Sequence, residues 1–279
     1  MKPLYFRSAT FLGFCLLSLS SAMAQEKSVK PGIDASVTAE DEDFDTQLMR
    51  ATVMISHDKS TGTGFVLTDG NKFILVTANH VFDGTPDDET TIVFRRKEAE
   101  GVYLKESAKL VIRKEGKPAW TKHPTEDVAT MWIVPPENAD VPKIPIGLLA
   151  SDELLRKHKV HPGENLSCLG FPHRNESNDA GFPILRSGPI ASFPLVPNKI
   201  SKTFYLSANT FEGDSGGPVY LTRTAGKEDL NLIIGLISGQ RFLDEEVKMV
   251  YGTTKLRHRL GLAIVVHGAF IKETIDQLP

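Results

Sequence analysis

The sequence predicts an all-β protein that ends in a helix, and three observations lead to this fold class. Short runs rich in Val, Ile, Thr and Phe recur from residue 51 onward, and turns rich in Gly, Asn and Asp separate them. A proline-containing break over residues 135–145 divides these runs into two sets. Near the end of the chain, Phe270, Ile271 and Ile275 have helical spacing. Short strands of this kind are typical of a barrel or a sandwich.

The composition is that of an ordinary soluble globular protein. Of the 279 residues, 41% are hydrophobic and 24% are charged, and the formal net charge is -3. A net charge this small gives no indication of a nucleic acid or another polyanion as partner. A chain of this length is able to bury its core as one large domain or as two barrels.

The N-terminus has the pattern of a secretory signal peptide. Lys2 and Arg7 form a positive region, residues 9–19 are apolar, and Ala22-Met23-Ala24 is a small-x-small cleavage site. The apolar stretch is short for a membrane span. We therefore expect cleavage after Ala24, no stable membrane anchor, and a secreted or periplasmic protein. An uncleaved anchor is the alternative.

Residues 25–46 are expected to form an acidic mobile arm. Five of the six residues from 40 to 45 are acidic, and apolar residues are few. Such a segment cannot bury enough surface to offset the entropy lost on ordering. A propeptide is the alternative for this segment.

Two sets of strands follow, and we assign them to domains over residues 47–150 and 151–279. The first set is predicted at residues 51–55, 64–67, 73–77, 90–94, 110–113 and 128–134. The second is predicted at residues 166–170, 184–187, 190–193, 203–207, 218–221, 231–238 and 262–266. A short helical linker is expected at residues 152–159, and a C-terminal helix at residues 269–278.

Cysteine usage excludes a disulfide framework. Only Cys168 remains after signal cleavage, so no intrachain disulfide is possible in the mature chain. Cys168 lies in the apolar run 166–170, where a small buried hydrophobe is a better interpretation than a reactive thiol. With one cysteine and scattered histidines, no metal-ligand spacing is present, so we expect neither a metal nor another cofactor.

Three motifs that lie far apart in the sequence supply the residue types of a catalytic triad. His80 ends Thr77-Ala78-Asn79-His80, Asp127 begins Asp127-Val128-Ala129, and Ser215 lies in Gly213-Asp214-Ser215-Gly216-Gly217-Pro218. A serine hydroxyl is a poor nucleophile without an adjacent base. A histidine is that base when an acid fixes its tautomer.

In their order and spacing, these motifs resemble those of trypsin-like (chymotrypsin-fold) serine proteases, of the secreted bacterial kind near the HtrA and glutamyl endopeptidase groups. Three further stretches add to the likeness, which spans roughly residues 47–279: Gly62-Thr63-Gly64-Phe65-Val66, Gly170-Phe171-Pro172 and, more weakly, Gly261-Leu262-Ala263-Ile264. The resemblance implies two perpendicular six-stranded β-barrels with a C-terminal helix, and an active site in the cleft between the barrels. It also implies endopeptidase activity on protein or peptide substrates.

The resemblance assigns a role to each residue of the triad. Ser215 attacks the scissile carbonyl, His80 transfers the proton, and Asp127 stays ionised and orients the imidazole. The backbone N–H groups of Gly213 and Ser215 form the oxyanion hole. His123 is a competing base, but it lacks the Thr-Ala-x-His context. His57 is expected to face solvent.

The resemblance also implies which residues bind the substrate. They are Asn209, Thr210, Ser238, Gly239 and Gln240. Asn209 falls at the floor of the primary specificity pocket, where a neutral amide cannot pair with lysine or arginine, so we expect a preference for uncharged side chains. Residues 238–240 are expected to expose a strand edge for antiparallel pairing with the substrate backbone.

Two other functions remain as alternatives to an endopeptidase. A catalytically silent homologue would serve as a protein-binding or adaptor module, although no member of the triad is missing. A hydrolase of small esters is disfavoured by the absence of a Gly-x-Ser-x-Gly elbow between a strand and a helix. As to activation by removal of a propeptide, Met49-Arg50-Ala51-Thr52-Val53 fits the start of a mature trypsin-type chain only loosely.

Overall fold

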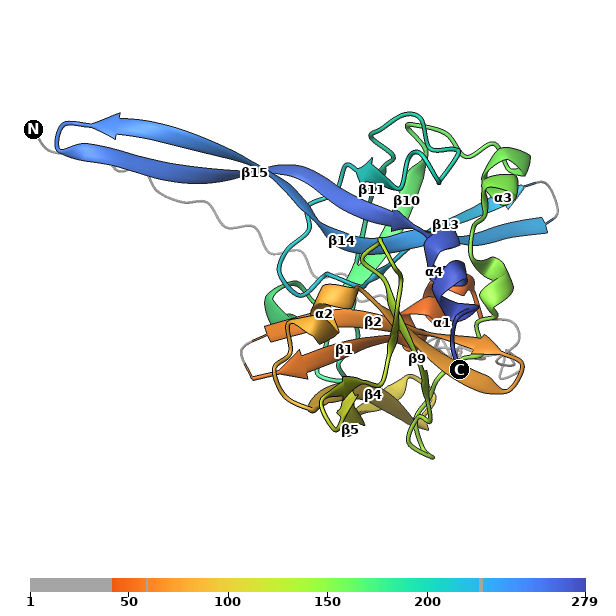
Figure 1. Cartoon of the computed structure of the whole chain (residues 1–279). Coiled ribbons are helices and arrows are strands. Elements are labelled where there is room, and N and C mark those ends of the chain that lie inside the picture. Colours follow the sequence, from red (N-terminus) through yellow and green to blue (C-terminus); the bar gives the residue numbers. More distant parts are fainter. Residues whose placement is uncertain (1–41, 59, 226–227) are drawn as a thin grey trace, which may run out of the picture. The chain divides into compact units, whose positions relative to one another are not determined.

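The computed structural model describes residues 42–58, 60–225 and 228–279 (Figure 1). The predicted signal peptide, residues 1–24, and most of the predicted acidic arm lie outside these residues. The described part consists mainly of two antiparallel β-sheets and ends in a helix, which confirms the predicted fold class. None of its helices is long and apolar enough to cross a membrane.

The first sheet has seven strands, one more than the six expected for a barrel. Their order in space is β5-β4-β1-β2-β3-β9-β8. The strands are β1 (Thr52–His57), β2 (Ser60–Asp69), β3 (Lys72–Thr77), β4 (Glu89–Ala99), β5 (Val102–Val111), β8 (Thr121–Lys122) and β9 (Ala129–Ile133). The short helix α2 (Asn79–Asp83) follows β3, and β6 (Arg113–Lys114) pairs with β7 (Lys117–Pro118) in a separate ribbon.

The second sheet has six strands in the order β11-β10-β13-β14-β15-β12. They are β10 (Asn165–Gly170), β11 (Ile184–Pro189), β12 (Thr203–Leu206), β13 (Pro218–Ala225), β14 (Glu228–Met249) and β15 (Gly252–His267). The 3-10 helices η1 (Ile146–Leu148) and η2 (Pro172–Arg174) lie in connections. The predicted linker helix is α3 (Asp152–Lys157), and the predicted C-terminal helix is α4 (Gly268–Ile275). The strand expected at residues 190–193 is reduced to one bridge between Ile190 and Leu206.

The core consists of three hydrophobic clusters, one of which joins the two sheets. One cluster lies within the first sheet and includes Val66 and Leu75, and another lies within the second and includes Cys168. The third cluster joins Phe65 of β2 to Tyr220 of β13, and it also contains residues of α4. Because buried side chains from both sheets share this cluster, the loops that carry the candidate catalytic residues are held by a packed interface. Cys168 is completely buried, as predicted, and burial raises the pKa of its thiol to about 11.

The helix α1 (Phe44–Ala51) precedes the first strand and begins inside the segment assigned to the acidic arm. Asp43 caps it by accepting a 2.9 Å hydrogen bond from the backbone N–H of Thr46. Phe44 is buried, and its ring packs edge-on against Tyr220 at 5.8 Å between centroids. Residues 44–46 therefore belong to the folded part of the chain, because their apolar contacts offset the cost of ordering them.

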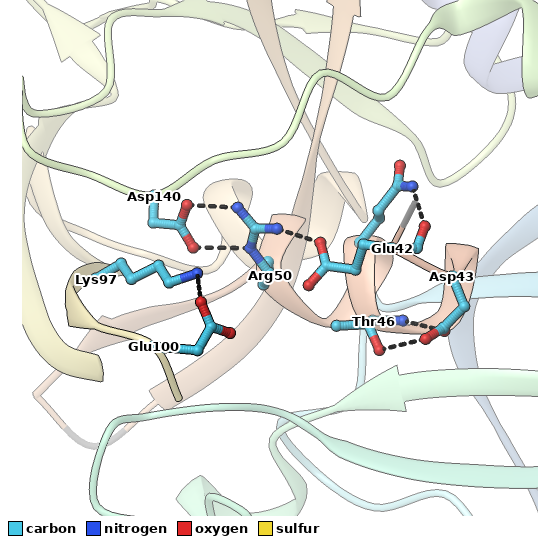
Figure 2. Close-up of polar contacts among 8 residues, drawn as sticks. Glu42, Asp43, Thr46, Arg50, Lys97, Glu100 and Asp140 are labelled. Atoms are coloured by element: carbon cyan, nitrogen blue, oxygen red, sulfur yellow. Dashed lines mark hydrogen bonds and ion pairs between the residues drawn. The ribbon is translucent and has the colours of Figure 1, made fainter. Parts of the chain in front are cut away.

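Two arginines fix the junction between α1 and β1. Arg50 forms an ion pair with Glu42 and donates to both carboxylate oxygens of Asp140, at 2.7 and 2.5 Å (Figure 2). The completely buried Arg95 donates to the carbonyl oxygens of Arg50 and Thr52, each at 2.5 Å. Burial lowers the pKa of Arg95 to about 10. The sequence that loosely resembles the start of a mature protease chain is thus enclosed by a polar network.

Strands β14 and β15 form a hairpin that is much longer than the sequence predicts. The expected strands end at residue 238 and resume at residue 262, but pairing continues to Met249 and Gly252. In Figure 1 this outer part, residues 241–260, projects from the second sheet. Its side chains are exposed apart from the partly exposed Val247, so it lacks the alternation of buried and exposed positions that identifies a strand in a sequence.

Candidate active site

Strand pairing in the first sheet brings the histidine and aspartate motifs together. Thr77, at the end of β3, pairs with Ala129, at the start of β9. His80 and Asp127 therefore lie just beyond the paired ends of these two strands. His80 Nδ1 lies 2.7 Å from Asp127 Oδ2, and the backbone N–H of His80 donates to Asp127 Oδ1 at 3.0 Å. The carboxylate therefore contacts both the ring and the backbone of His80, and in this way orients the imidazole.

Ser238 completes the hydrogen bonding of Asp127. The register of β14 against β15 passes from Ile237↔Val265 to Gly239↔Ile264, which makes Ser238 the extra residue of a β-bulge. Its hydroxyl donates to Asp127 Oδ2 at 2.6 Å. Sequence reasoning assigned Ser238 to substrate binding and missed this contact, because the two residues are 111 positions apart and the bulge that directs Ser238 to Asp127 leaves no local sequence signal.

The hydrogen bonds to Asp127 keep its carboxylate charged. Burial alone would raise its pKa, but the hydrogen bond and charge of His80, together with the bonds from Ser238 and the His80 backbone, lower the pKa below the usual value. An ionised Asp127 is able to stabilise a positively charged imidazole at His80.

Ser215 lies in the loop before β13, and both sheets hold this loop. From β2, the backbone N–H of Thr63 donates to the Ser215 carbonyl at 2.8 Å, and the Thr63 hydroxyl donates to the Gly213 carbonyl at 2.7 Å. From the second sheet, the Ile237 carbonyl accepts from the Gly216 N–H at 2.7 Å. The position of Ser215 therefore depends on correct packing of the two sheets.

Gly213 has a backbone conformation that only glycine adopts easily. Its φ is +99°, and a Cβ atom there would lie 2.2 Å from the Phe171 carbonyl oxygen. The neighbouring Glu212 carbonyl accepts a 2.6 Å hydrogen bond from the His173 N–H. In a trans peptide the N–H points away from the carbonyl, so the Gly213 N–H is directed away from His173.

The N–H groups of Gly213 and Ser215 both lack a hydrogen-bond partner within the described residues. Gly213, Ser215 and His80 together line a cleft of about 170 Å³. Two free N–H groups beside a cleft are donors for a negatively charged oxygen. No hydrogen bond joins Ser215 to His80 in the described part of the chain, a contact that in many hydrolases tightens only when substrate binds.

Asp214, between Gly213 and Ser215, is completely buried and paired with Arg186 of β11. The guanidinium donates to both carboxylate oxygens, at 2.5 and 2.6 Å, and the Phe211 N–H donates to Oδ2 at 2.7 Å. Burial would lower the pKa of Arg186, but the bonds to Asp214 more than offset this and raise it. The ion pair holds the loop around Ser215 against β11. Sequence reasoning missed it because the two residues are separated by 28 positions.

The residues expected to bind substrate lie along the second sheet, and none of them is among the residues that line the 170 Å³ cleft. Asn209 is exposed, and its side chain lies beside Gly261 of β15. A Cβ atom at Gly261 would be 3.3 Å from Asn209 Oδ1. Thr210 is buried. Gly239 and Gln240 pair with Ile264 and Ala263 of β15.

The competing titratable residues have other partners. His123 is buried, its Nε2 lies 3.2 Å from Glu273 of α4, and its Nδ1 accepts from two backbone N–H groups, so it supports the fold. Glu126 pairs with Lys202 at 2.6 Å. The expectation that His57 faces solvent is wrong, because its side chain is only 14% exposed. Its Nε2 lies 3.2 Å from an Asp87 carboxylate oxygen, and the residue lines the same cleft as His80.

The family model described as a trypsin-like peptidase domain matches residues 62–226. No curated protein sequence matches the chain. Among solved structures, the chain is similar to a serine-to-alanine mutant of Rv3671c from M. tuberculosis H37Rv in its inactive form, with 17% identity, a TM-score of 0.44, and coverage of 83% of this chain and 88% of that chain. Because the family model matches more than half of its residues, the chain belongs to the trypsin-like peptidase domain family.

Proposed function

We propose that this trypsin-like peptidase is a secreted or periplasmic serine endopeptidase that uses His80, Asp127 and Ser215. Ser215 attacks the scissile carbonyl and forms an acyl-enzyme, while His80 accepts the serine proton and passes it to the leaving amine. Asp127 remains ionised and stabilises the histidine cation. The N–H groups of Gly213 and Ser215 stabilise the oxyanion.

The observation that carries this proposal is the 2.7 Å contact between His80 Nδ1 and Asp127 Oδ2, because His80 and Ser215 line the same cleft. It links a base to an orienting acid next to a serine in a glycine-rich loop, which is the arrangement that nucleophilic catalysis requires. The two unpaired N–H groups beside Ser215 support the same mechanism. A catalytically silent adaptor does not require an oriented histidine or an oxyanion hole.

We further propose that the enzyme lies near the HtrA and glutamyl endopeptidase groups, with barrels over residues 47–150 and 151–279. Its substrates are proteins or peptides that pair with residues 238–240 and carry an uncharged side chain before the cut. Asn209 offers no anion that could pair with a lysine or arginine side chain of the substrate. Profiling of cleavage sites in a peptide library tests this preference, and a dominant lysine or arginine before the cut contradicts it.

Active-site labelling distinguishes the proposed enzyme from the silent homologue. The folded protein is incubated with a fluorophosphonate, which reacts with serines activated by an adjacent base. We expect one modified peptide that contains Ser215, no labelling of the Ser215→Ala variant, and retained labelling of the matched control Ser207→Ala. Absence of label on the folded wild-type protein would favour the adaptor.

A further inference from the structure

The long hairpin of β14 and β15 carries two different faces. Paired residues share a face, so the register places Phe242, Asp244 and Glu246 on one side with Arg259, Arg257 and Lys255. This side is charged: Arg257 lies 2.7 Å from Asp244, and Lys255 lies 3.5 Å from Glu246. The opposite side carries the apolar residues Leu243, Val247, Met249 and Leu256, together with one pair of polar residues, Glu245 and His258, whose side chains lie 2.9 Å apart.

The apolar side has no covering element within the described part of the chain. Leu243, Met249 and Leu256 are 55%, 61% and 44% exposed. A two-stranded ribbon of this kind is only marginally stable in water, and a third strand is usually needed. We call residues 241–260 the outer ribbon.

Both strands of the outer ribbon have a free edge, but only one of them is continuous with the active site. Strand β13 pairs with β14 only as far as Pro218↔Leu236, and Ile237 bonds to Gly216 and Gly217. From Ser238 to Met249, the β14 edge on that side has no strand beside it among the described residues. Its other edge is occupied by β15. A chain that pairs with residues 238–240 must therefore use the edge beside Ser215.

The direction of β14 decides which part of a substrate meets the outer ribbon. Strand β14 runs outward from Ser238, near Asp127, to Met249. A substrate strand antiparallel to β14 runs inward, so the residues that precede the scissile bond lie along the ribbon. At about 3.3 Å per residue, the free edge accommodates on the order of ten such residues.

On this basis we propose that the outer ribbon is an extended binding site for unfolded polypeptide, which adds as a third strand to β14 on the N-terminal side of the cut. The inference rests on the proposed peptidase function and adds a substrate class to it. Main-chain hydrogen bonds to the β14 edge supply affinity, and apolar substrate side chains at alternate positions lie beside Leu243, Val247 and Met249. A folded protein or a short peptide cannot make these contacts.

The test compares quenched fluorescent peptides that share one cleavage segment and differ in length. One peptide carries about four residues before the cut and the other about twelve, with apolar side chains at alternate positions. We expect kcat/KM to be at least about tenfold higher for the long peptide. An equal extension after the cut, or N-methylation of alternate amides in the extension, is expected to abolish the gain.

Two variants, one with three threonine substitutions and one with two, localise the effect. Leu243→Thr, Val247→Thr and Met249→Thr together are expected to bring the long-to-short ratio close to one. The matched control on the charged side, Glu246→Thr with Lys248→Thr, keeps the wild-type ratio. Threonine favours strands, so both variants preserve the ribbon.

The possible outcomes separate failure of the extended binding site from failure of the peptidase function. Hydrolysis of both peptides at equal rates contradicts the extended site but leaves the peptidase intact, whereas no hydrolysis of any peptide contradicts the proposed function itself. A dimer in solution that the apolar triple variant abolishes, without a change in the length ratio, shows that a second copy occupies the ribbon and overturns the inference.

Discussion

Arg186 and Asp214 form a bidentate ion pair whose carboxylate is completely buried, one residue before Ser215. A buried carboxylate needs a counterion, and here an arginine of the same folded domain supplies it. The loop around Ser215 therefore has its electrostatic partner without any cleavage of the chain. This arrangement, together with the enclosed α1–β1 junction, favours a site that is formed without removal of a propeptide.

Loss of this counterion is expected to destabilise the protein and inactivate it. Arg186→Met leaves the Asp214 carboxylate buried and unpaired, which should lower the free energy of unfolding by about 3–5 kcal/mol and abolish peptide hydrolysis. Urea unfolding and a hydrolysis assay measure both effects. The matched control is Arg257→Met, which breaks the exposed pair with Asp244 and should leave the stability close to wild type. Unchanged stability of Arg186→Met would show that the pair is dispensable.

The acid of the triad is expected to be Asp127 and not its neighbour. Asp127→Asn should slow turnover by about 10⁴, the effect of losing the correct histidine tautomer. Glu126→Gln, whose carboxylate faces Lys202, should remain near wild type in the same kcat/KM measurement. If the two results were exchanged, the assignment of the acid would be wrong.

The contact between Ser238 and Asp127 predicts a change in pH dependence. The Ser238 hydrogen bond helps to lower the pKa of Asp127, so Ser238→Ala should raise this pKa. Activity that requires an ionised Asp127 should then be lost at a higher pH than in the wild type, which shifts the acid limb of the kcat/KM profile upward. Profiles that superimpose over the acid limb would rule out this role for Ser238.

The conformation of Gly213 predicts that even a methyl group is not tolerated there. In Gly213→Ala the Cβ atom would meet the Phe171 carbonyl and the residue would keep a positive φ, so the N–H is expected to move out of the oxyanion hole. Loss of one such donor typically costs about 10²–10³ in turnover. The control Gly147→Ala has open space around its Cβ position and should be neutral. A fully active, folded Gly213→Ala protein would argue against this oxyanion hole.

His267 is expected to limit stability in acid. It is buried beside Phe204, and burial lowers its pKa to about 4. Between the unfolded value near 6.5 and about pH 4, the unfolded chain binds more protons at this residue than the folded one. The free energy of unfolding should therefore fall by about 3 kcal/mol as the pH is lowered through this window. Urea unfolding at several pH values should show a shallower fall for His267→Leu, and parallel curves would contradict this assignment.

Local patterns in the sequence predicted the elements that contribute to the core. The strands β3 and β9 form from continuous apolar runs, and the two motifs next to them, around His80 and Asp127, lie together because these strands pair. The helix at residues 152–159 was predicted from a similar pattern and is shorter by two residues. Whether each of these segments is helix or strand depends on neighbouring residues in the sequence, and a local pattern records them.

The features that the sequence did not reveal depend on contacts between distant residues. Arg186 carries no mark of its pairing with Asp214, and the bulge that directs Ser238 to Asp127 arises from the register of two strands. The outer ribbon was not predicted as strand, because its side chains are exposed on both sides and show no alternation of buried and exposed positions. Its two strands are identified only by their pairing with each other, which the composition of the segment does not record.

The most direct test of the central claim is hydrolysis by the pure Ser215→Ala protein compared with wild type, on a peptide that the wild type cleaves. Removal of the nucleophile should reduce kcat on the order of 10⁶-fold, while circular dichroism and urea unfolding remain close to wild type because Ser215 is not in the core. Retention of most turnover by the folded Ser215→Ala protein would contradict the proposed mechanism.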